Sequence, residues 1–541
     1  MSGPDPSAWG PTPETRSDGG EMVNRSPASD TTWSADGTED DGVSSTDDAV
    51  TSAGSVESVL RRGRYTFMPV FGFSIARIAA QRYGSRRDID TGLPSTEADH
   101  DYLLDGHEMS WWESDSVMPA HPFALVNPAG GIGGVDLSEH DFRDVFRFER
   151  GEQFIFADSG GFQLVTIDDA EMVDDPADHD FNEYRINPER LVEWQVRNAD
   201  AGSTIDFPPY GNTEGTQNFA AQDEFTREWE SQFYDHAVRH REMVERMGHR
   251  LQELRDDGAD GAAGYLFAPV IQARPHPRAD DSHKLAREWW KRAVDGAADA
   301  GLQKPRAWTL SPKPATSIGQ VAYHLAFAAE YLDDAEYIHV LQVSGEQQLP
   351  LLMYYASRTD QMVTSDSTAH TYGAKARRFE LPRTARRRFT VLSTRDEEEN
   401  EYLSPTELDF FPCRCPVCTR TQRDRGFDAI ASGETSLDST PIVLHNLQQI
   451  LDMNRTFDAM LREDESNVTI GGEPVGTEFW RLLDSFFDEK TLRDLHTALE
   501  YVATAFDDGL DAANRRYRVL WNSSGGRTIV PASDSASSTS W

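Results

Sequence analysis

Short apolar segments rich in β-favouring residues recur along the middle of the chain, and each ends in small or polar residues. They lie at residues 65–72, 123–128, 154–160, 203–207, 265–273, 306–311, 337–345 and 362–367. Amphipathic helical patterns occupy several of the gaps, at residues 188–198, 283–298, 317–332 and 347–357. Strands that alternate with helices predict an α/β fold with a parallel sheet, and eight such units close a (β/α)8 TIM barrel. An open doubly wound sheet is the alternative that this pattern allows.

Polar residues follow four of these predicted strands. Asp158, Asp206, Gln272 and Asp366 lie at or near the C-terminal ends of their strands. In a barrel these ends converge on one face, where active sites are built. The position of the four residues therefore favours the barrel and predicts a site on that face. Each aspartate could instead cap the helix that follows it.

The pattern changes towards both ends of the chain. Residues 1–56 and 523–541 are poor in aliphatic residues and are predicted to be disordered. Between them we expect a TIM-barrel domain, a zinc-binding subdomain and a helical C-terminal extension, at residues 57–395, 396–455 and 456–522. Helical patterns in the last two parts lie at residues 442–453, 478–486 and 490–506.

The chain is strongly acidic, with 92 Asp and Glu against 52 Lys and Arg and a formal net charge of −40. Because the acidic residues are interspersed with ordinary core segments, they favour adaptation to high salt over mimicry of a nucleic acid. High salt screens phosphate attraction, so this acidity does not exclude a nucleic-acid substrate. The sequence has neither a long apolar run nor a signal-peptide pattern at its start. We therefore expect a soluble cytoplasmic protein without a membrane partner.

All three cysteines lie within six residues, as Cys413, Cys415 and Cys418, and His445 follows after 26 intervening residues. Three thiolates and one imidazole make a closed tetrahedral shell suited to Zn²⁺. With no open coordination position, the predicted zinc is structural. The clustering argues against a disulfide framework and for a reducing compartment. Three buried cysteines beside an unrelated histidine are the alternative.

Four motifs, taken together and in this order, resemble the tRNA-guanine transglycosylase superfamily. They are FMPVFG at residues 67–72, DSGGFQ at residues 158–163, Asp366 in VTSDSTAH, and the Cys-x-Cys-x-x-Cys motif with its distant histidine. The resemblance covers roughly residues 60–455. It implies a pentosyltransferase that replaces a guanine in tRNA by a 7-deazaguanine, preQ0-like or queuine-like, through a covalent aspartyl intermediate.

The resemblance also implies roles for individual residues. Asp366 would attack C1′ of the target nucleotide, and Asp158 would act as the general acid and base. This division suits an oxocarbenium-like transition state, which one carboxylate traps while a shielded second one carries a proton. The residues implied in substrate binding are Ser159, Gly160, Gly161, Phe162, Gln163, Asp206 and Gln272. Among these, Asp206 and Gln272 would grip the purine edge and Phe162 would form an apolar wall.

Three segments depart from the family pattern, and all would touch the base pocket. Gln272 is followed by Ala273 and Arg274 where the family has two glycines, and residues 205–211 and 309–315 also differ. These changes affect which base enters the pocket.

A basic run at residues 375–388 directly follows the predicted nucleophile and holds seven Lys or Arg against one Glu. We expect these side chains to contact the phosphate backbone. They are Lys375, Arg377, Arg378, Arg383, Arg386, Arg387 and Arg388. A solvated charge run that pairs with the acidic surface is the alternative.

Three functions are compatible with the sequence. The first is base exchange on tRNA, and the second is the same exchange on DNA. The resemblance keeps DNA open because archaeal tRNA enzymes of this family typically carry a C-terminal RNA-binding module, and none is recognisable after residue 453. The third is a non-catalytic partner subunit of a transglycosylase, which keeps the fold and the zinc and has lost the chemistry. Such subunits typically lack one key aspartate, whereas Asp158 and Asp366 are both present here. The sequence therefore favours an active enzyme. A homodimer or a heterodimer is the oligomeric state that we expect.

Overall fold

The computed structural model divides the chain into two units, Met1–Ala53 and Gly54–Trp541. The first unit lies outside the described residues, and so does the disorder predicted there. Within the second unit the structure describes residues 59–71, 110–130 except 113 and 115, 141–207 except 168, 227–273, 283–312, 317–370 except 346 and 369, 378–382, 389–393, 413–424, 440–461, 468–470, 473–475, 487, 489–521 and 527–532.

Two parallel sheets form the centre of the described part of the chain. The first is five-stranded, in the order β1 (Arg64–Pro69), β11 (Met362–Ser367), β10 (Tyr337–Val340), β9 (Ala307–Leu310) and β8 (Val270–Ile271). The second is four-stranded, in the order β2 (Phe123–Val126), β3 (Phe154–Ala157), β6 (Ala201–Ser203) and β7 (Leu266–Ala268). Every strand pair in the two sheets is parallel, as the alternation of strands and helices predicts.

Two local connections join these sheets. An isolated parallel bridge pairs Val70, just after β1, with Leu125 in β2. Strands β7 and β8 are separated only by Pro269, which has no backbone N–H to donate. The carbonyl of Pro269 still accepts a hydrogen bond from the backbone of Thr309 at 3.0 Å. The first half of the strand predicted at residues 265–273 thus pairs in the four-stranded sheet as β7, and the second half pairs in the five-stranded sheet as β8.

All eight predicted strand segments overlap observed strands, but the fourth was placed too late. We expected residues 203–207, whereas β6 is Ala201–Ser203. A Cβ on Gly202 would lie 2.4 Å from the hydroxyl of Tyr265 and 2.9 Å from Gln195 Cδ. Close packing therefore demands small residues in this strand, and small residues carry little hydrophobic signal.

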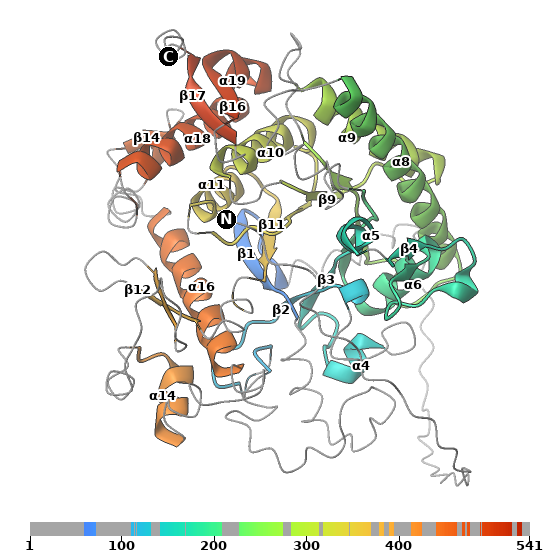
Figure 1. Cartoon of the computed structure of the whole chain (residues 1–541), viewed down its shortest axis with the longest axis horizontal. Coiled ribbons are helices and arrows are strands. Elements are labelled where there is room, and N and C mark those ends of the chain that lie inside the picture. The colour runs from blue at the N-terminus through green and yellow to red at the C-terminus, as the bar shows by residue number, and fades with distance from the viewer. Residues whose placement is uncertain are drawn as a thin grey trace, which may run out of the picture. The chain divides into compact units, whose positions relative to one another are not determined.

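The helices between the strands follow the predicted amphipathic patterns. Helices α6 (Pro188–Asn198), α9 (Lys284–Asp299), α10 (Ile318–Tyr331) and α11 (Leu349–Arg358) confirm the four predicted segments. Asn187 and Ser317 cap α6 and α10 through side-chain oxygens that accept backbone N–H groups. Figure 1 shows α8, α9, α10 and α11 on the outside of the central strands.

Several elements of this region were not predicted. The longest is α8 (Arg227–Asp256), whose sequence is rich in charged residues and which packs against α6 and α9. The others are short: η2 (Pro128–Gly130), α4 (Phe142–Phe146), α5 (Gly161–Thr166), β4 (Glu171–Met172), η3 (Pro176–Asp178) and β5 (Arg185–Ile186).

The C-terminal part combines helices with antiparallel hairpins. Its helices are α14 (Pro416–Asp424), α16 (Thr440–Leu461), α18 (Glu489–Asp508) and α19 (Leu510–Arg516). Its paired strands are β12 (Arg378–Pro382) with β13 (Phe389–Ser393), β14 (Val468–Ile470) with β15 (Glu473–Val475), and β16 (Tyr517–Trp521) with β17 (Arg527–Pro531). The last hairpin spans residue 522, where we expected the helical C-terminal extension to end. The helix predicted at residues 478–486 lies outside the described residues.

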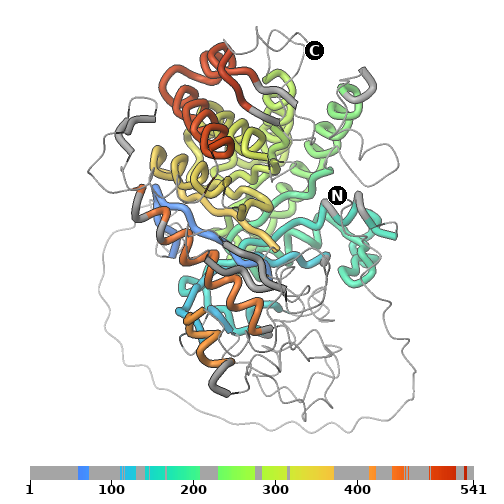
Figure 2. The backbone as a smooth tube through the Cα atoms, turned by 60° about the vertical axis from the view of Figure 1, so that its left-hand side comes forward, coloured from blue at the N-terminus to red at the C-terminus, as the bar shows by residue number. Residues whose placement is uncertain are grey.

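Two of these helices lie against the central elements. In Figure 2, α16 runs beside β1, and an ion pair between Arg64 and Asp458 joins the two. Helix α18 packs on α10, and His283 Nε2 lies 2.9 Å from Asp511 Oδ1 of α19. Across the described residues, no helix is both long enough and apolar enough to pass through a bilayer.

The buried apolar residues form two separate clusters. The smaller cluster takes side chains from β1, β2, β3, β6, β7, β9, β10 and β11, and includes Met68, Leu125, Phe156 and Tyr337. The larger cluster contains the inward faces of the helices and the alternate residues of the strands. Because side chains of a strand point alternately to opposite faces, the strands bury one face in each cluster.

Candidate functional site

Asp158 is the first residue after β3. Its backbone N–H donates to the carbonyl of Val126 at 2.8 Å, which continues the strand pairing by one residue. Its carboxylate accepts hydrogen bonds from the backbone N–H of Ser159 at 2.8 Å and from Asn127 Nδ2 at 3.1 Å. The N-cap of the following helix α5 is Gly160, which makes no side-chain capping bond, so Asp158 is not a helix cap.

The surroundings of Asp158 favour its protonated form. Burial raises the pKa of this carboxyl, and the negative charge of Asp366 raises it further. Hydrogen bonds from Ser159 and Ser203 act in the opposite direction, as a positive charge on His339 would. The net shift is upward, so Asp158 has the character of a carboxylic acid that can hold and release a proton.

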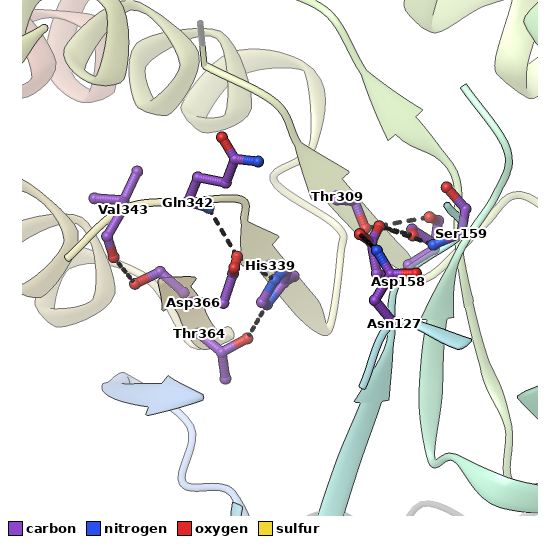
Figure 3. Close-up of polar contacts among 12 residues, drawn as sticks. Asn127, Asp158, Ser159, Thr309, His339, Gln342, Val343, Thr364 and Asp366 are labelled. Carbon is purple, nitrogen blue, oxygen red and sulfur yellow. Dashed lines mark hydrogen bonds and ion pairs between the residues drawn. The ribbon is translucent and has the colours of Figure 1, made fainter. Parts of the chain in front are cut away.

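Asp366 lies within β11 and is 5% exposed. Its Oδ1 accepts the backbone N–H of Gln342 at 2.7 Å and lies 3.3 Å from Nε2 of His339. No described residue forms a hydrogen bond with Oδ2. Figure 3 shows these contacts on one side of the site and the contacts of Asp158 on the other. The described residues therefore anchor one carboxylate oxygen and leave the other without a hydrogen bond.

His339 of β10 links the surroundings of the two aspartates. Its ring is fully buried and stacks on Phe156 of β3, with centroids 3.9 Å apart and an interplanar angle of 20°. Phe156 precedes Asp158 by two residues on the same strand. Sequence reasoning missed His339, Asn127 and Gln342. The one signal for His339 was a polar residue inside an otherwise apolar strand.

Asp206 and Gln272, which both lie near strand ends, also contact each other. Nε2 of Gln272 donates to Oδ2 of Asp206 at 2.8 Å, and both side chains are buried. A Cβ on Gly161 would lie 2.7 Å from Oδ1 of Asp206 and 2.3 Å from its carbonyl oxygen. Glycine at this position therefore allows the turn after β3 to pack directly on Asp206.

The rest of the DSGGFQ segment forms a tight turn into α5. Gly160 has a φ of +74°, and Oγ of Ser159 accepts the backbone N–H of Gly161 at 3.2 Å. Two buried acceptors near this turn, Oδ1 of Asn127 and Oε1 of Gln163, have no hydrogen-bond partner among the described residues. Buried acceptors of this kind normally receive a donor from ordered water or from a ligand. The side chain of Phe162 lies outside the described part of the chain.

Six of the seven basic residues of the run at residues 375–388 lie outside the described residues. Lys375, Arg377, Arg383, Arg386, Arg387 and Arg388 are not described. Arg378 begins β12, but the structure does not describe its side chain. Their predicted contact with a phosphate backbone remains a prediction.

The four predicted metal ligands come together between α14 and α16. The donor atoms of Cys413, Cys415, Cys418 and His445 all lie within 4.8 Å of one another. The three sulfurs are 3.6, 3.4 and 3.1 Å from Nδ1 of His445, in the order of the chain. Ligands of one tetrahedral zinc ion are separated by roughly 3.6 Å, given the usual zinc–sulfur and zinc–nitrogen bond lengths. The group could bind a metal ion, and its donors are consistent with zinc.

Comparison with known proteins adds no relative to this description. No protein-family model matches the chain, and no curated protein matches it either.

Proposed function

We propose that the two parallel sheets form one closed (β/α)8 barrel. The pairings run from β1 through β11, β10 and β9 to β8, and from β7 through β6 and β3 to β2. The Val70–Leu125 bridge joins β2 to β1, and Pro269 is all that separates β7 from β8. A small apolar cluster that takes side chains from all of these strands except β8 supports closure, because the interior of a barrel is filled by alternate side chains of its strands.

Within this barrel we propose a base-exchange pentosyltransferase of the guanine transglycosylase type that acts on tRNA. The observation that carries the proposal is a pair of carboxyls in unlike surroundings. Asp158 directly follows β3 of the four-stranded sheet, and Asp366 lies within β11 of the five-stranded sheet. Asp366 would be the nucleophile, since its Oδ2 is free of hydrogen bonds from the described residues. Asp158 would be the general acid and base, since burial and the charge of Asp366 raise its pKa.

The proposed reaction has two displacement steps. In the first, Oδ2 of Asp366 bonds to C1′, the C1′–N9 bond breaks, and the departing guanine takes the proton of Asp158. In the second, the Asp158 carboxylate removes the N9 proton of a 7-deazaguanine, whose N9 bonds to C1′ as the aspartyl ester breaks. Each step inverts C1′, so configuration is retained and the polymer is not cut.

The surroundings of the turn after β3 suit a guanine-like base. Such a base presents N–H donors along its Watson–Crick edge, and reading it requires acceptors. Asp206 supplies a carboxylate held by Gln272, while Asn127 and Gln163 supply orphan acceptor oxygens. Reaching C1′ would require the nucleotide to be extruded from its stack.

We propose that the Cys3His group holds a structural Zn²⁺. The ion would fix α14 against α16, and α16 in turn packs beside β1. We also propose that the basic run at residues 375–388 contacts the phosphates of the polymer near Asp366.

The decisive experiment offers the purified protein radiolabelled guanine together with either tRNA or duplex DNA in high salt. We expect label in tRNA; label in DNA would keep the reaction and change the polymer, and label in neither would overturn the proposal.

Asp366→Ala tests the nucleophile in the polymer that is labelled. We expect loss of exchange and loss of the covalent protein–polynucleotide complex on a denaturing gel, because no carboxylate remains to trap C1′. The exposed Asp257→Asn serves as the matched control and should retain both. A covalent complex that persists in Asp366→Ala would remove this residue from the nucleophile role.

A further inference from the structure

A chain of three side chains leads from the interior of the strands to the carboxylate of Asp366. The hydroxyl of Tyr337 lies 2.6 Å from Oγ1 of Thr364, and this oxygen lies 2.8 Å from Nδ1 of His339. Nε2 of His339 lies 3.3 Å from Oδ1 of Asp366. Tyr337, His339 and Thr364 are all fully buried. No water-exposed group interrupts this chain of described residues.

The protons of this chain can be assigned from the requirement that buried donors have acceptors. Burial raises the pKa of Tyr337, so its hydroxyl keeps its proton. The contact of that hydroxyl among the described residues is Oγ1 of Thr364, which must therefore accept. The hydroxyl of Thr364 can then donate its own proton to Nδ1 of His339. Because Nδ1 accepts this hydrogen bond, a neutral ring must carry its proton on Nε2.

The opposite assignment leaves an unfavourable contact. If Nδ1 of His339 donated to Thr364, a neutral ring would present the lone pair of Nε2 to Oδ1 of Asp366. Two acceptors 3.3 Å apart in a buried site repel each other. The Nε2–H form instead places a donor at this carboxylate oxygen, beside the donor that Gln342 supplies at 2.7 Å.

The position of the ring is fixed as well as its proton. The face of His339 stacks on Phe156, and its Cα is the register partner of Thr364 across the β10–β11 pair. The ring is contacted by Thr364 and Asp366 from β11 and by Phe156 from β3, and Tyr337 reaches it through Thr364. Asp158 interacts with it through charge.

We propose that His339 is a positioning residue, held as its neutral Nε2–H tautomer by the Tyr337–Thr364 hydroxyl chain. Its N–H anchors Oδ1 of Asp366 and directs Oδ2 to the reacting carbon. The tautomer is inferred from the hydrogen-bond chain alone, whereas the effect of His339 on catalysis rests on the proposed function. A neutral ring also removes one influence on Asp158, since positive charge on His339 would lower the pKa of that carboxyl.

The tautomer can be measured without any substrate. Protein labelled with ¹⁵N in its histidine rings is studied by NMR near neutral pH, and His339→Gln assigns the signal by its loss. We expect a neutral ring protonated at Nε2 in the wild-type protein. In Thr364→Val the preference for Nε2–H should weaken, and in Thr364→Ser it should be retained. A wild-type ring protonated at Nδ1 overturns the inference.

Kinetics test the consequence for Asp366. His339→Leu should lower the rate of covalent complex formation by about 100-fold and Thr364→Val by about 10-fold, the range typical of residues that orient a reactive group. His339→Gln keeps an N–H near Oδ1 and should recover part of the loss, and Thr364→Ser should be close to wild type. The KM for guanine should stay unchanged, because neither residue is proposed to touch the base.

A double-mutant cycle separates positioning from a general loss of stability. In the His339→Leu background, Thr364→Val should cause no further loss of rate, because the hydroxyl chain acts through the ring. Additive losses, or equal losses in Thr364→Val and Thr364→Ser, overturn the inference. Thermal unfolding of each variant identifies any that are unfolded. If the wild-type protein labels neither polymer, the proposed function fails, and the NMR measurement decides the tautomer by itself.

Discussion

Asp158 and Asp366 have the same side chain but are surrounded differently. Asp158 follows β3 and is held by donors from Asn127 and Ser159, yet burial and the charge of its partner raise its pKa. Asp366 lies inside β11, where both anchoring contacts fall on a single oxygen. Unlike environments of this kind are how one site obtains an acid and a nucleophile from two identical carboxyls.

The raised pKa of Asp158 predicts a pH-dependent stability. A carboxyl whose pKa is higher in the folded protein contributes stability below its unfolded pKa, and this stability is lost as pH rises through the folded pKa. Asp158→Asn cannot ionise, so its melting temperature relative to wild type should rise with pH from acid to alkaline conditions. Differential scanning calorimetry at several pH values checks this.

Asp257→Asn, which alters an exposed carboxyl after α8, provides the control and should show a nearly constant difference from wild type. A pH-independent difference for Asp158→Asn would contradict the raised pKa. In the same variant, base exchange should fall by about 10²-fold to 10⁴-fold, the usual contribution of a general acid and base.

At the scale of elements, two short features determine how the site is assembled. The turn after β3 needs glycine twice: Gly160 has a φ of +74°, and Gly161 packs against Asp206 too closely for a Cβ. Pro269 divides a single extended segment into β7 and β8, which pair with different strands. Both features bring the ends of neighbouring strands together.

The metal group connects two helices, and its loss should affect both metal content and stability. Cys415→Ser removes one of four donors, so we expect loss of bound zinc and a decrease in unfolding free energy on the order of 4 kcal/mol or more. Zinc analysis by mass spectrometry and urea unfolding measure the two effects. Thr419→Ala, an exposed substitution on α14, should change neither. A Cys415→Ser protein that keeps both its zinc and its stability would rule out this residue as a ligand.

At the scale of the whole molecule, the proposed closure of the barrel would have a measurable consequence. The backbone N–H of Phe71 donates to the carbonyl of Leu125 at 2.8 Å, across the junction between β1 and β2. In a closed barrel this amide should exchange with deuterium as slowly as those of β9 and β10, because no strand is an edge. Hydrogen exchange read by mass spectrometry tests this. Fast exchange at the junction, with protection elsewhere in the sheets, would indicate an open sheet.

The net charge of −40 predicts a second property of the whole chain. Self-repulsion among acidic side chains destabilises the compact state, and added salt screens it. The melting temperature should therefore rise from low to multimolar potassium chloride. Sucrose at matched water activity serves as the control for nonspecific exclusion. A melting temperature that is unaffected by salt would show that the charge does not limit stability.

The sequence by itself determined most strand positions, the four helices between the strands and the four residues that could bind a metal ion. These features are local, since each depends on hydrophobic periodicity or on the spacing of rare residues such as Cys413, Cys415 and Cys418. It placed β6 too late, because the small residues of this strand carry little apolar signal, and it missed α8, whose pattern is dominated by charge.

Only the tertiary structure decided which polar side chains act on one another. Asn127, Gln342 and His339 reach the two aspartates from other strands or from the residues after them, and no local pattern in the sequence encodes such contacts. The same holds for the pKa of Asp158, which depends on burial and on a charge from β11. Strand pairing joins residues that are distant along the chain, so the chemistry of this site follows from the register of the sheets.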